Sequence, residues 1–267
     1  MDYQPPNFVP YNIQEMLKIR TLENVRLSEP LAQSLNHGRQ DSYGKRLIYI
    51  SGPNGVGKDT LLDIALDILA EKGIESISRF PRTTTRPRRK AERDGIDYFF
   101  QSEEEMLDGW RRYIAMTRYP ANQCLYGIDG AKMGDALQGG RHVVMVAGID
   151  FAPVLKKFFP ESTSIYILPP SAEELERRLS ERESDSEELR ERFRVGEEEI
   201  ISVFGSLYGR RCYFNNAIDA AINNDDLQKS SLQLAEMIEK AMDGVRPDPS
   251  DRLERLRAEF HRVMDAR

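Results

Sequence analysis

The chain has 267 residues, of which 40% are hydrophobic and 31% are charged, as expected for a soluble globular protein of one or two domains. The net charge of −6 argues against general nucleic-acid binding, and no apolar run is long enough to span a membrane, so neither is an expected partner. Cys124 and Cys212 provide no disulfide framework, and the first residues lack the features of a signal peptide. We therefore expect a cytoplasmic protein.

Residues 1–44 are predicted to form an extension that precedes the main domain. The first ten residues are rich in proline, and apolar residues then recur at helical spacing from Tyr11 to about Leu35. The stretch from His37 to Gly44 is polar and contains glycine, which indicates a domain boundary. We expect the main domain to cover residues 45–243.

The stretch from Leu47 to Leu69 predicts a buried strand, a glycine-rich loop and a helix with an apolar face. Gly52 and Gly57 have the spacing of a phosphate-binding loop, and Lys58 follows directly. Glycines let backbone N–H groups turn toward phosphate oxygens, and the lysine adds a mobile charge. A plain strand-to-helix turn is the simpler alternative. The predicted phosphate-binding residues are Gly52, Pro53, Asn54, Gly55, Val56, Gly57, Lys58, Asp59 and Thr60.

The residue after the lysine departs from the usual pattern. Serine or threonine normally stands there, and its hydroxyl meets Mg²⁺. This chain has Asp59 at that position, followed by Thr60. A carboxylate is itself a good Mg²⁺ ligand, but Asp59 could equally cap the helix N-terminus. We keep both interpretations, with Asp59 and Thr60 as the candidate metal ligands.

Five cations lie close together next to hydroxyl residues between Pro81 and Lys90. Such a stretch cannot belong to a hydrophobic core, so it either forms a solvated loop or lines a site for an anion. Arginine suits phosphate because its planar fork binds two oxygens at once.

Strands and helices alternate through the rest of the main domain. The predicted strands cover 74–80, 113–117, 124–127, 143–149, 165–168 and 220–222. The predicted helices cover 102–112, 131–137, 152–159 and 227–242, with capping boxes at Ser102/Glu105 and Ser171/Glu174. This alternation predicts an α/β fold in which helices flank a parallel sheet.

Two further segments are dominated by charge or by amphipathic spacing. From Ser171 to about Glu199 the chain is rich in Glu and Arg, which indicates either a solvated helix face or arginines that serve a site. Residues 244–267 are predicted to form a C-terminal amphipathic helix, with its apolar stripe at Leu253, Leu256, Phe260 and Val263. We expect this stripe to pack on the N-terminal extension or on a second subunit, which would make a homodimer through the terminal helices.

Four motifs together resemble the guanylate kinase family of nucleoside monophosphate kinases. They are SGPNGVGKDTLL, TTTRPRRKAERDGIDYFF, YILPPSAEELERRL and INNDDL, and they occur in this order between about Arg46 and Lys240. The resemblance implies a core sheet that binds ATP at its phosphate loop with Mg²⁺. It also implies a small acceptor-binding subdomain at about 79–130 and a helical lid at about 178–195.

The resemblance also implies roles for individual residues. The residues that match the family's contacts to the acceptor phosphate are Thr83, Arg86, Arg89, Tyr98 and Tyr126. Those that match the arginines around the transferred phosphoryl group are Arg178, Arg182 and Arg192, which act with Lys58. Asn224 matches a contact on the adenine side of ATP. Phosphoryl transfer needs positioning and cations more than covalent chemistry, which suits this set.

The chain departs from the family where the guanine ring should bind. Ala115 stands where a glutamate is expected, and Val146 to Gly148 replace two expected acidic residues, with Asp150 slightly later. Asp59 and the VMVAGID strand are similar to a related branch, the ribose 1,5-bisphosphate phosphokinases. The acceptor phosphate site is thus kept, whereas the base site is altered.

The predicted function is ATP-dependent phosphoryl transfer to a nucleoside monophosphate, with GMP and ATP giving GDP and ADP. One alternative is a kinase of the same fold that acts on another phosphorylated acceptor, such as ribose 1,5-bisphosphate. A second alternative is a guanylate kinase-like binding domain without catalysis, although the intact phosphate loop argues against it.

Overall fold

The structure is a computed structural model that describes residues 45–138, 140–181, 186–204 and 217–246. The predicted extension at 1–44 lies outside the described residues, and so does the predicted C-terminal helix apart from 244–246. The predicted homodimer through these segments therefore stays a prediction. Within the described part, no helix combines the length and apolarity that crossing a bilayer would require.

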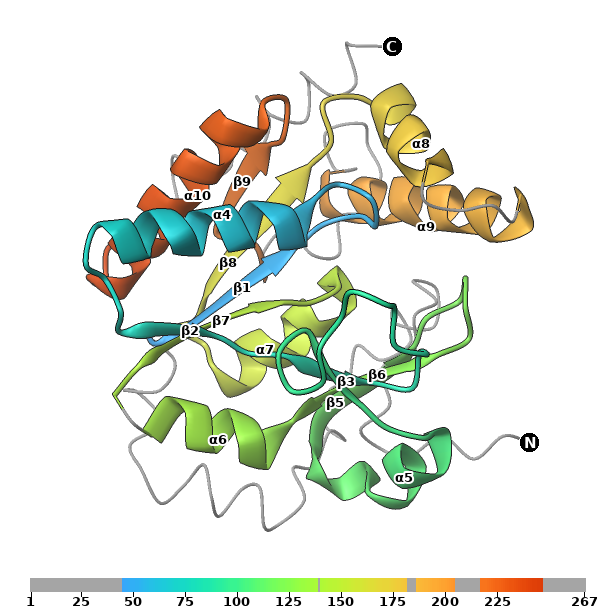
Figure 1. The fold of residues 1–267 in the computed structure, drawn as a ribbon, viewed down its shortest axis with the longest axis horizontal. Helices are drawn as coiled ribbons and strands as arrows, with labels where there is room; N and C mark the ends of the chain where they lie inside the picture. Colours follow the sequence, from blue (N-terminus) through green and yellow to red (C-terminus); the bar gives the residue numbers. More distant parts are fainter. Residues whose placement is uncertain (1–44, 139, 182–185, 205–216, 247–267) are drawn as a thin grey trace.

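A parallel sheet of five strands forms the centre of the fold (Figure 1). Its strands lie in the order β2-β7-β1-β8-β9, and every neighbouring pair is parallel. The bounds are Leu47–Ser51 for β1, Ile77–Arg79 for β2, His142–Val146 for β7, Thr163–Leu168 for β8 and Ala220–Asn223 for β9. The predicted α/β fold around a parallel sheet is confirmed.

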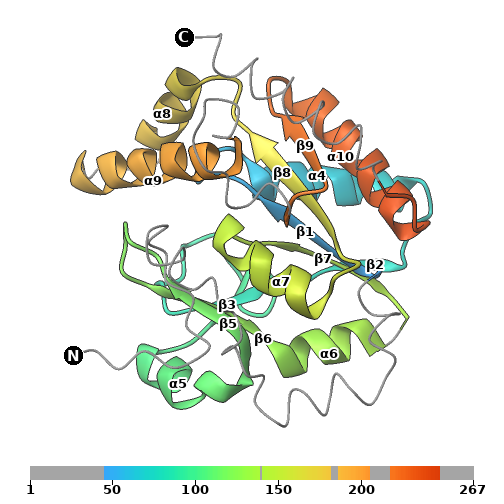
Figure 2. The same cartoon turned by 180° about the vertical axis from the view of Figure 1, so that it is seen from behind.

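Helices cover both faces of this sheet because its strands are apolar on both sides. Ile48 and Ile50 of β1 face α4 (Lys58–Glu71) and α10 (Leu227–Met242), which lie side by side. Leu47 and Tyr49 point to the opposite face, where α7 (Ala152–Phe158) and α6 (Gly130–Gln138) pack (Figure 2). The sheet thus lies between two hydrophobic layers, and its strand ends are free to carry loops.

A second sheet of four strands lies beside the first. Its order is β4-β3-β6-β5, with β3 parallel to β4 and the other pairs antiparallel. The bounds are Arg82–Thr84 for β3, Tyr98–Phe100 for β4, Tyr113–Arg118 for β5 and Leu125–Asp129 for β6. Helix α5 (Glu103–Asp108) begins at the predicted capping box of Ser102 and Glu105, and the 3-10 helix η2 (Trp110–Arg112) follows it.

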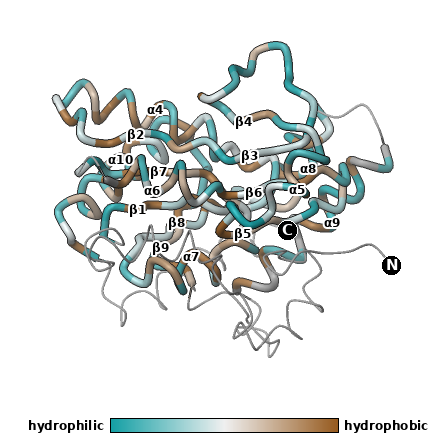
Figure 3. The backbone as a smooth tube through the Cα atoms, turned by 90° about the horizontal axis from the view of Figure 1, so that it is seen from below, coloured by the Kyte–Doolittle hydropathy of each residue, from teal (hydrophilic) through white to brown (hydrophobic). Residues whose placement is uncertain are grey.

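Strands β3 and β4 were not expected from the sequence, which left this stretch as a charged loop or anion site. Each strand has only three residues, too few to show an alternating pattern. The chain between them is largely hydrophilic, as its teal colour in Figure 3 shows, whereas the strands of the parallel sheet are mostly apolar. The cations therefore lie on a loop that a small sheet holds at both ends.

The charge-rich segment forms two helices, α8 (Ala172–Ser180) and α9 (Ser186–Phe204). Ser171 accepts a hydrogen bond from the backbone N–H of Glu174, but the carboxylate of Glu174 binds Arg177 and Arg178 instead of returning to the cap. Arg194 likewise pairs with glutamates one turn away on α9. Much of this stretch is thus a solvated helix face. A short 3-10 helix, η3 (Ile149–Phe151), comes soon after β7 in the chain.

Candidate active site

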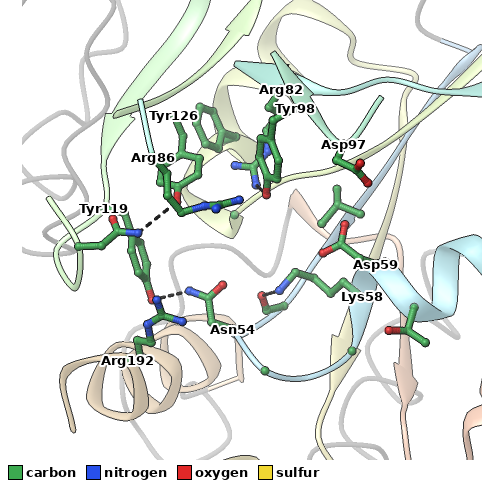
Figure 4. A pocket seen from close by; sticks show the side chains of 18 of the residues that line it. Asn54, Lys58, Asp59, Arg82, Arg86, Asp97, Tyr98, Tyr119, Tyr126 and Arg192 are labelled. Carbon is green, nitrogen blue, oxygen red and sulfur yellow. Dashed lines mark hydrogen bonds between the residues drawn. The ribbon is translucent and has the colours of Figure 1, made fainter. Parts of the chain in front are cut away.

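A cavity of about 300 Å³ opens where the phosphate loop, the second sheet and helix α9 meet (Figure 4). A cavity of this size is at the lower end of the range for small-molecule sites. It extends from Lys58 at the loop to Asp150 of η3, and Arg192 of α9 lies near the loop. Residues far apart in the sequence therefore share one site.

The loop between β1 and α4 has a backbone that only glycine adopts without strain. Gly52 has a φ of +140°, and a Cβ added there would lie 2.3 Å from the carbonyl oxygen of Ile167 in β8. Gly57 has a φ of +92°, and its added Cβ would lie 2.9 Å from the side chain of Asn224. The loop is thus both left-handed at these points and packed closely against the sheet.

Two side chains hold this loop in place. The ammonium of Lys58 donates hydrogen bonds to the carbonyl oxygens of Gly52, at 2.6 Å, and of Pro53, at 2.8 Å. The amide of Asn224 donates to the carbonyl oxygen of Val56 at 2.8 Å, while its own backbone N–H bonds Leu168. Lys58 therefore already lies across the mouth of the loop, where phosphate oxygens would bind.

Asp59 does not cap helix α4, for no side chain caps that N-terminus. Its carboxylate instead pairs with the guanidinium of Arg79, which also binds Asp63. Asp59 and Thr60 both line the cavity, and the side chain of Asp59 is 54% exposed. A carboxylate beside a hydroxyl, open to solvent, fits a Mg²⁺ ion that nucleotide phosphates help to bind. No cluster of acidic, histidine or cysteine ligands that could hold a metal without them occurs in the described residues.

Glu92 organises the two arginines that match the acceptor phosphate site. Its carboxylate binds the guanidinium of Arg86 at 2.6 Å and the backbone N–H of Arg89 at 2.8 Å. Burial alone would raise the pKa of Glu92, but these bonds outweigh it and lower that pKa. Arg86 also stacks on the ring of Tyr98, with its guanidinium carbon 5.4 Å from the ring centre. Arg86 is therefore positioned before any ligand binds, whereas the side chain of Arg89 is 62% exposed.

A third arginine, Arg82, lies among the aromatic rings of the cavity. Its guanidinium carbon lies 5.7 Å from the ring centre of Tyr98, 5.4 Å from that of Tyr126 and 5.7 Å from that of Phe151. It also donates a long hydrogen bond of 3.4 Å to the hydroxyl of Tyr98. These are cation–π contacts, which fix a cation without neutralising it.

Asp150 lies at the same end of the cavity, on η3, and only 3% of its surface is exposed. Neither of its carboxylate oxygens has a hydrogen-bond partner of normal geometry among the described residues. Burial raises the pKa of Asp150 to about 6, although the charge of Arg82 and nearby polar groups of Thr117 and the backbone oppose the shift. A buried carboxylate without partners is unusual in a folded protein.

Tyr119, after β5, connects the second sheet to the phosphate loop. The side-chain amide of Asn54 in the loop donates a hydrogen bond to the Tyr119 hydroxyl (Figure 4). Burial raises the pKa of that hydroxyl, so it stays protonated. Arg192 lies close by and its charge acts on the same group. The two halves of the cavity are therefore joined by a direct polar contact.

The structure brings together most of the residues predicted from the sequence. Of the predicted set, those that line the cavity are Gly52, Asn54, Gly55, Gly57, Lys58, Asp59, Thr60, Arg86, Arg89, Tyr98, Tyr126 and Arg192. Pro53 and Val56 belong to the loop but are buried, and they contribute backbone carbonyls instead. Arg182 lies outside the described residues.

Besides Pro53 and Val56, three further predicted residues within the described part do not line the cavity. Thr83 is buried with 1% of its surface exposed, and the preceding residue, Arg82, faces the cavity in its place. Arg178 binds Glu174 and donates to the carbonyl oxygen of Asn224 at 3.4 Å. Asn224 itself supports the loop, and its side-chain oxygen has no hydrogen-bond partner among the described residues.

Sequence reasoning did not assign several residues that the structure places at the cavity. These are Arg79, Arg82, Glu92, Tyr119 and Asp150. The excess of cations between Pro81 and Lys90 pointed to Arg82, but nothing in the sequence indicated which side of the chain it would face. The arrangement as a whole can hold two phosphate groups, one at the loop and one at Arg86, in a cavity that further cations line.

The fold and the cavity define a phosphate-loop kinase with a separate acceptor side. A family model described as guanylate kinase matches residues 44–241. Guanylate kinase of Prochlorococcus marinus is 33% identical over 72% of this chain and 96% of its own length. Guanylate kinase of Caldanaerobacter subterraneus subsp. tengcongensis is 36% identical over 67% of this chain and 80% of its own length.

A solved structure of guanylate kinase from Anaplasma phagocytophilum superposes with a TM-score of 0.51. It is 23% identical and covers 73% of this chain and 85% of that one, so it supports the fold alone. The chain belongs to the guanylate kinase family, and it is a kinase. The relatives do not favour the alternative with a ribose bisphosphate acceptor.

Proposed function

We propose that this protein transfers the terminal phosphoryl group of ATP to GMP and releases GDP and ADP. Its relatives at 30% identity or more are named guanylate kinases, and the family model covers the whole region that forms the cavity. The carrying observation is the arrangement of two phosphate-binding features, the loop at Gly52–Thr60 and the arginine at position 86, around one cavity.

The chain's own groups then act by position and charge. The loop N–H groups and Lys58 hold the outer phosphates of ATP, while Arg86 and Arg89 hold the phosphate of GMP through their planar forks. Arg192 reaches the cavity from α9 and contributes positive charge where the moving phosphoryl group passes. GMP already carries an ionised phosphate as its nucleophile, so no protein base is required.

Asp59 and Thr60 are the residues that would hold Mg²⁺ beside the ATP phosphates. When bound, the ion neutralises charge on the phosphate oxygens during transfer. Arg79 neutralises Asp59 in the protein without nucleotide, and this pairing keeps a carboxylate close to the loop at low electrostatic cost. Arg79 must give up part of its contact with Asp59 for the carboxylate to serve as a metal ligand.

The lid side carries Arg178 and the part of α9 near Arg192. Arg178 is held by Glu174 and by the backbone of Asn224, which also supports the phosphate loop. We assign Arg178 and Asn224 to the ATP side through these loop contacts. Arg182 keeps its proposed role at the phosphoryl group from the family resemblance.

The test is a coupled assay of ADP release with MgATP over a panel of acceptors. The panel contains GMP, dGMP, AMP, UMP, CMP and ribose 1,5-bisphosphate. We expect turnover with GMP and dGMP at least tenfold above that with the other acceptors. Turnover with the ribose bisphosphate and none with GMP would overturn the proposal in favour of a sugar-phosphate kinase.

The Lys58→Ala variant is the control for catalysis in the same assay. Removing this cation should reduce turnover by about 10³-fold, since cations around the transferred phosphoryl group dominate this chemistry. GMP binding, followed by calorimetry, should change little because Lys58 serves the ATP side. A variant that keeps full turnover would show that the measured activity comes from a contaminating kinase.

Location and assembly are proposed from the sequence. A cytoplasmic location suits an enzyme whose substrates are nucleotides, and the composition supports it. A homodimer through the terminal helices rests on the apolar stripe between Leu253 and Val263. Deleting the residues after Pro249 should then halve the mass measured by light scattering.

A further inference from the structure

Two oppositely charged side chains lie at the acceptor end of the cavity, and neither belongs to the proposed phosphate-binding groups. Arg82 comes from β3 of the second sheet, and Asp150 comes from η3 after β7 of the central sheet. The junction of the two sheets therefore brings them to one cavity wall.

Asp150 and Thr117 offer buried polar atoms for which the described residues provide no well-formed hydrogen bond. Both carboxylate oxygens of Asp150 and the hydroxyl of Thr117 are buried and make no hydrogen bond of normal geometry within the described residues. The exposed fractions are 3% for Asp150 and 2% for Thr117. Buried polar groups without partners cost free energy, so their presence in a ligand cavity calls for a partner from the ligand.

Arg82 is close enough to Asp150 to influence it electrostatically, yet neither carboxylate oxygen of Asp150 accepts a hydrogen bond of normal geometry from it. No carboxylate among the described residues lies within ion-pair distance of its guanidinium, whereas Arg79 and Arg86 are both paired. The rings of Tyr98, Tyr126 and Phe151 hold Arg82 in place. Ring contacts thus hold the cation beside the anion in the cavity wall, and no ion pair joins the two.

The ligand group that fits between them must accept a hydrogen bond from Arg82 and donate to Asp150. A second phosphate would satisfy Arg82, but the charge of Asp150 would repel it. Guanine presents an acceptor, O6, beside two donors, N1–H and the amino group N2–H₂. Adenine presents a donor at N6 and an acceptor at N1, which reverses this order.

We propose that Arg82 and Asp150 recognise the guanine ring of the acceptor, with Arg82 donating to O6 and Asp150 accepting from N1–H and N2–H₂. Once the base is bound, the Thr117 hydroxyl donates a hydrogen bond to Asp150 and so helps to hold the carboxylate against N1–H and N2–H₂ of guanine. This inference rests on the proposed GMP kinase activity. It explains how a chain with Ala115 and with Val146 to Gly148 at the expected acidic positions still selects guanine.

The test compares GMP, IMP and AMP, since IMP has O6 and N1–H but lacks the amino group. Binding is measured by calorimetry without ATP, and kcat/KM is measured in the coupled assay. In Asp150→Asn the amide donates where a carboxylate accepted, so kcat/KM for GMP should fall by about 10- to 100-fold. The ratio of kcat/KM for GMP to that for IMP should fall toward one, and kcat/KM for AMP should change less than threefold.

Arg82→Met provides a different signature because methionine keeps the ring contacts but removes the donor. GMP and IMP both carry O6, so kcat/KM for both should fall by about the same factor, on the order of tenfold. The GMP-to-IMP preference should be retained and the preference for GMP over AMP should shrink. Asp135→Asn, which removes an exposed charge on α6, is the matched control and should change none of these ratios.

Each result separates this inference from the function on which it rests. If wild-type protein phosphorylates GMP and both variants lower kcat/KM for GMP, IMP and AMP by equal factors, the two residues are structural. The inference then fails while the proposed function stands. If ribose 1,5-bisphosphate binds better than GMP and loses affinity in Arg82→Met, Arg82 is an anion site and the inference is overturned. If wild-type protein neither binds nor phosphorylates GMP, the proposed function fails and the inference with it.

Discussion

The ATP side and the acceptor side of the cavity are built on different principles. The phosphate loop is shaped by backbone, with glycines at strained angles and its carbonyls bonded to Lys58 and Asn224. The acceptor side is shaped by side chains that come from β3, β4, β5 and η3, and the carboxylate oxygens of Asp150 there make no hydrogen bond of normal geometry among the described residues. A site for a common cosubstrate can be a local motif, whereas a site for a specific acceptor needs groups from several elements.

The largest effect should come from a small change on the backbone-built side. Gly52→Ala places a methyl group against the carbonyl of Ile167 and strains a φ of +140°. We expect ATP binding by calorimetry to weaken beyond detection and turnover to fall at least about 10³-fold. Gly73→Ala is the matched control, because Gly73 has a φ of +78° but nothing near its added Cβ. It should cost about 1–2 kcal/mol of stability and leave ATP affinity intact.

If Gly52→Ala keeps normal ATP affinity, the loop tolerates a side chain, and the contrast between the two sides disappears. Thermal unfolding of both glycine variants separates loss of folding from loss of binding. Gly52→Ala should remain folded at 25 °C, since only one loop is strained and the central sheet keeps its core.

On the side-chain-built side, geometry should matter more than charge. Arg86→Lys keeps the charge but loses the fork that Glu92 and Tyr98 hold in place. We expect the KM for GMP to rise about 10- to 100-fold, with the KM for ATP unchanged. Arg89→Lys is the comparison, and its effect should be several-fold smaller because that side chain is largely exposed. Equal effects at the two positions would contradict a preformed site at Arg86.

Substitution of Asp150 should change the stability of the protein as well as its selectivity. Burial raises its folded pKa to about 6 from the ordinary aspartate value of 3.8, so the charged form is disfavoured in the fold. Above pH 6 this lowers the stability of the wild-type protein by about 3 kcal/mol, and the penalty falls to about 1 kcal/mol near pH 4.5 as folded Asp150 takes up a proton. Asp150→Asn should therefore raise the free energy of unfolding at pH 7.5, and this gain should shrink in acid.

Chemical denaturation of Asp150→Asn and wild-type protein at pH 7.5 and pH 4.5 measures this difference. A variant that is less stable than wild type at both pH values would indicate that Asp150 has structural partners after all. Arg82 is the only charged group that the structure shows acting on Asp150 among the described residues, and the other groups that act on it are the polar groups of Thr117 and of the backbone.

The smallest effect should lie where the two sides meet, at the pairing of Arg79 with Asp59. Arg79→Gln frees Asp59, and the Mg²⁺ concentration for half-maximal turnover should fall about two- to fivefold, the range for exposed ion pairs. Asp63→Asn should do the reverse, because it leaves Arg79 with Asp59 as its only carboxylate partner among the described residues. Titration of Mg²⁺ against bound ATP, followed by calorimetry, gives a reading that does not depend on turnover. Identical Mg²⁺ requirements in both variants would remove Asp59 from the metal site.

Local signals in the sequence predicted local structure well. The phosphate loop and the capping box at Ser102 each depend on residues within a few positions of one another. The parallel sheet also followed from its apolar strands. Strand β2 begins at Ile77, later than predicted, because the residues before it lead in from the turn after α4.

The acceptor side could be predicted only in part, and Arg82 shows why. Which of Arg82 and Thr83 faces the cavity depends on the pleat of a three-residue strand, and that pleat is set by pairing with β4 and β6. Asp150 was noted only as a displaced acid, since its burial depends on how η3 meets the second sheet. Tyr119 and Asn54 are 65 residues apart and carry no shared pattern.

The hydrogen bond from Asn224 to Val56 connects ATP binding to the edge of the central sheet. Asn224 directly follows β9, the last strand in the order, which pairs with β8 on one side. Edge strands open before the core does, and when β9 opens the loop loses its support at Val56. Bound ATP should therefore slow amide hydrogen exchange along Ala221 to Asn223, at a distance from the nucleotide. In this fold, the fraction of loops that hold ATP therefore also sets the fraction of time for which strand β9 stays paired at the edge of the sheet.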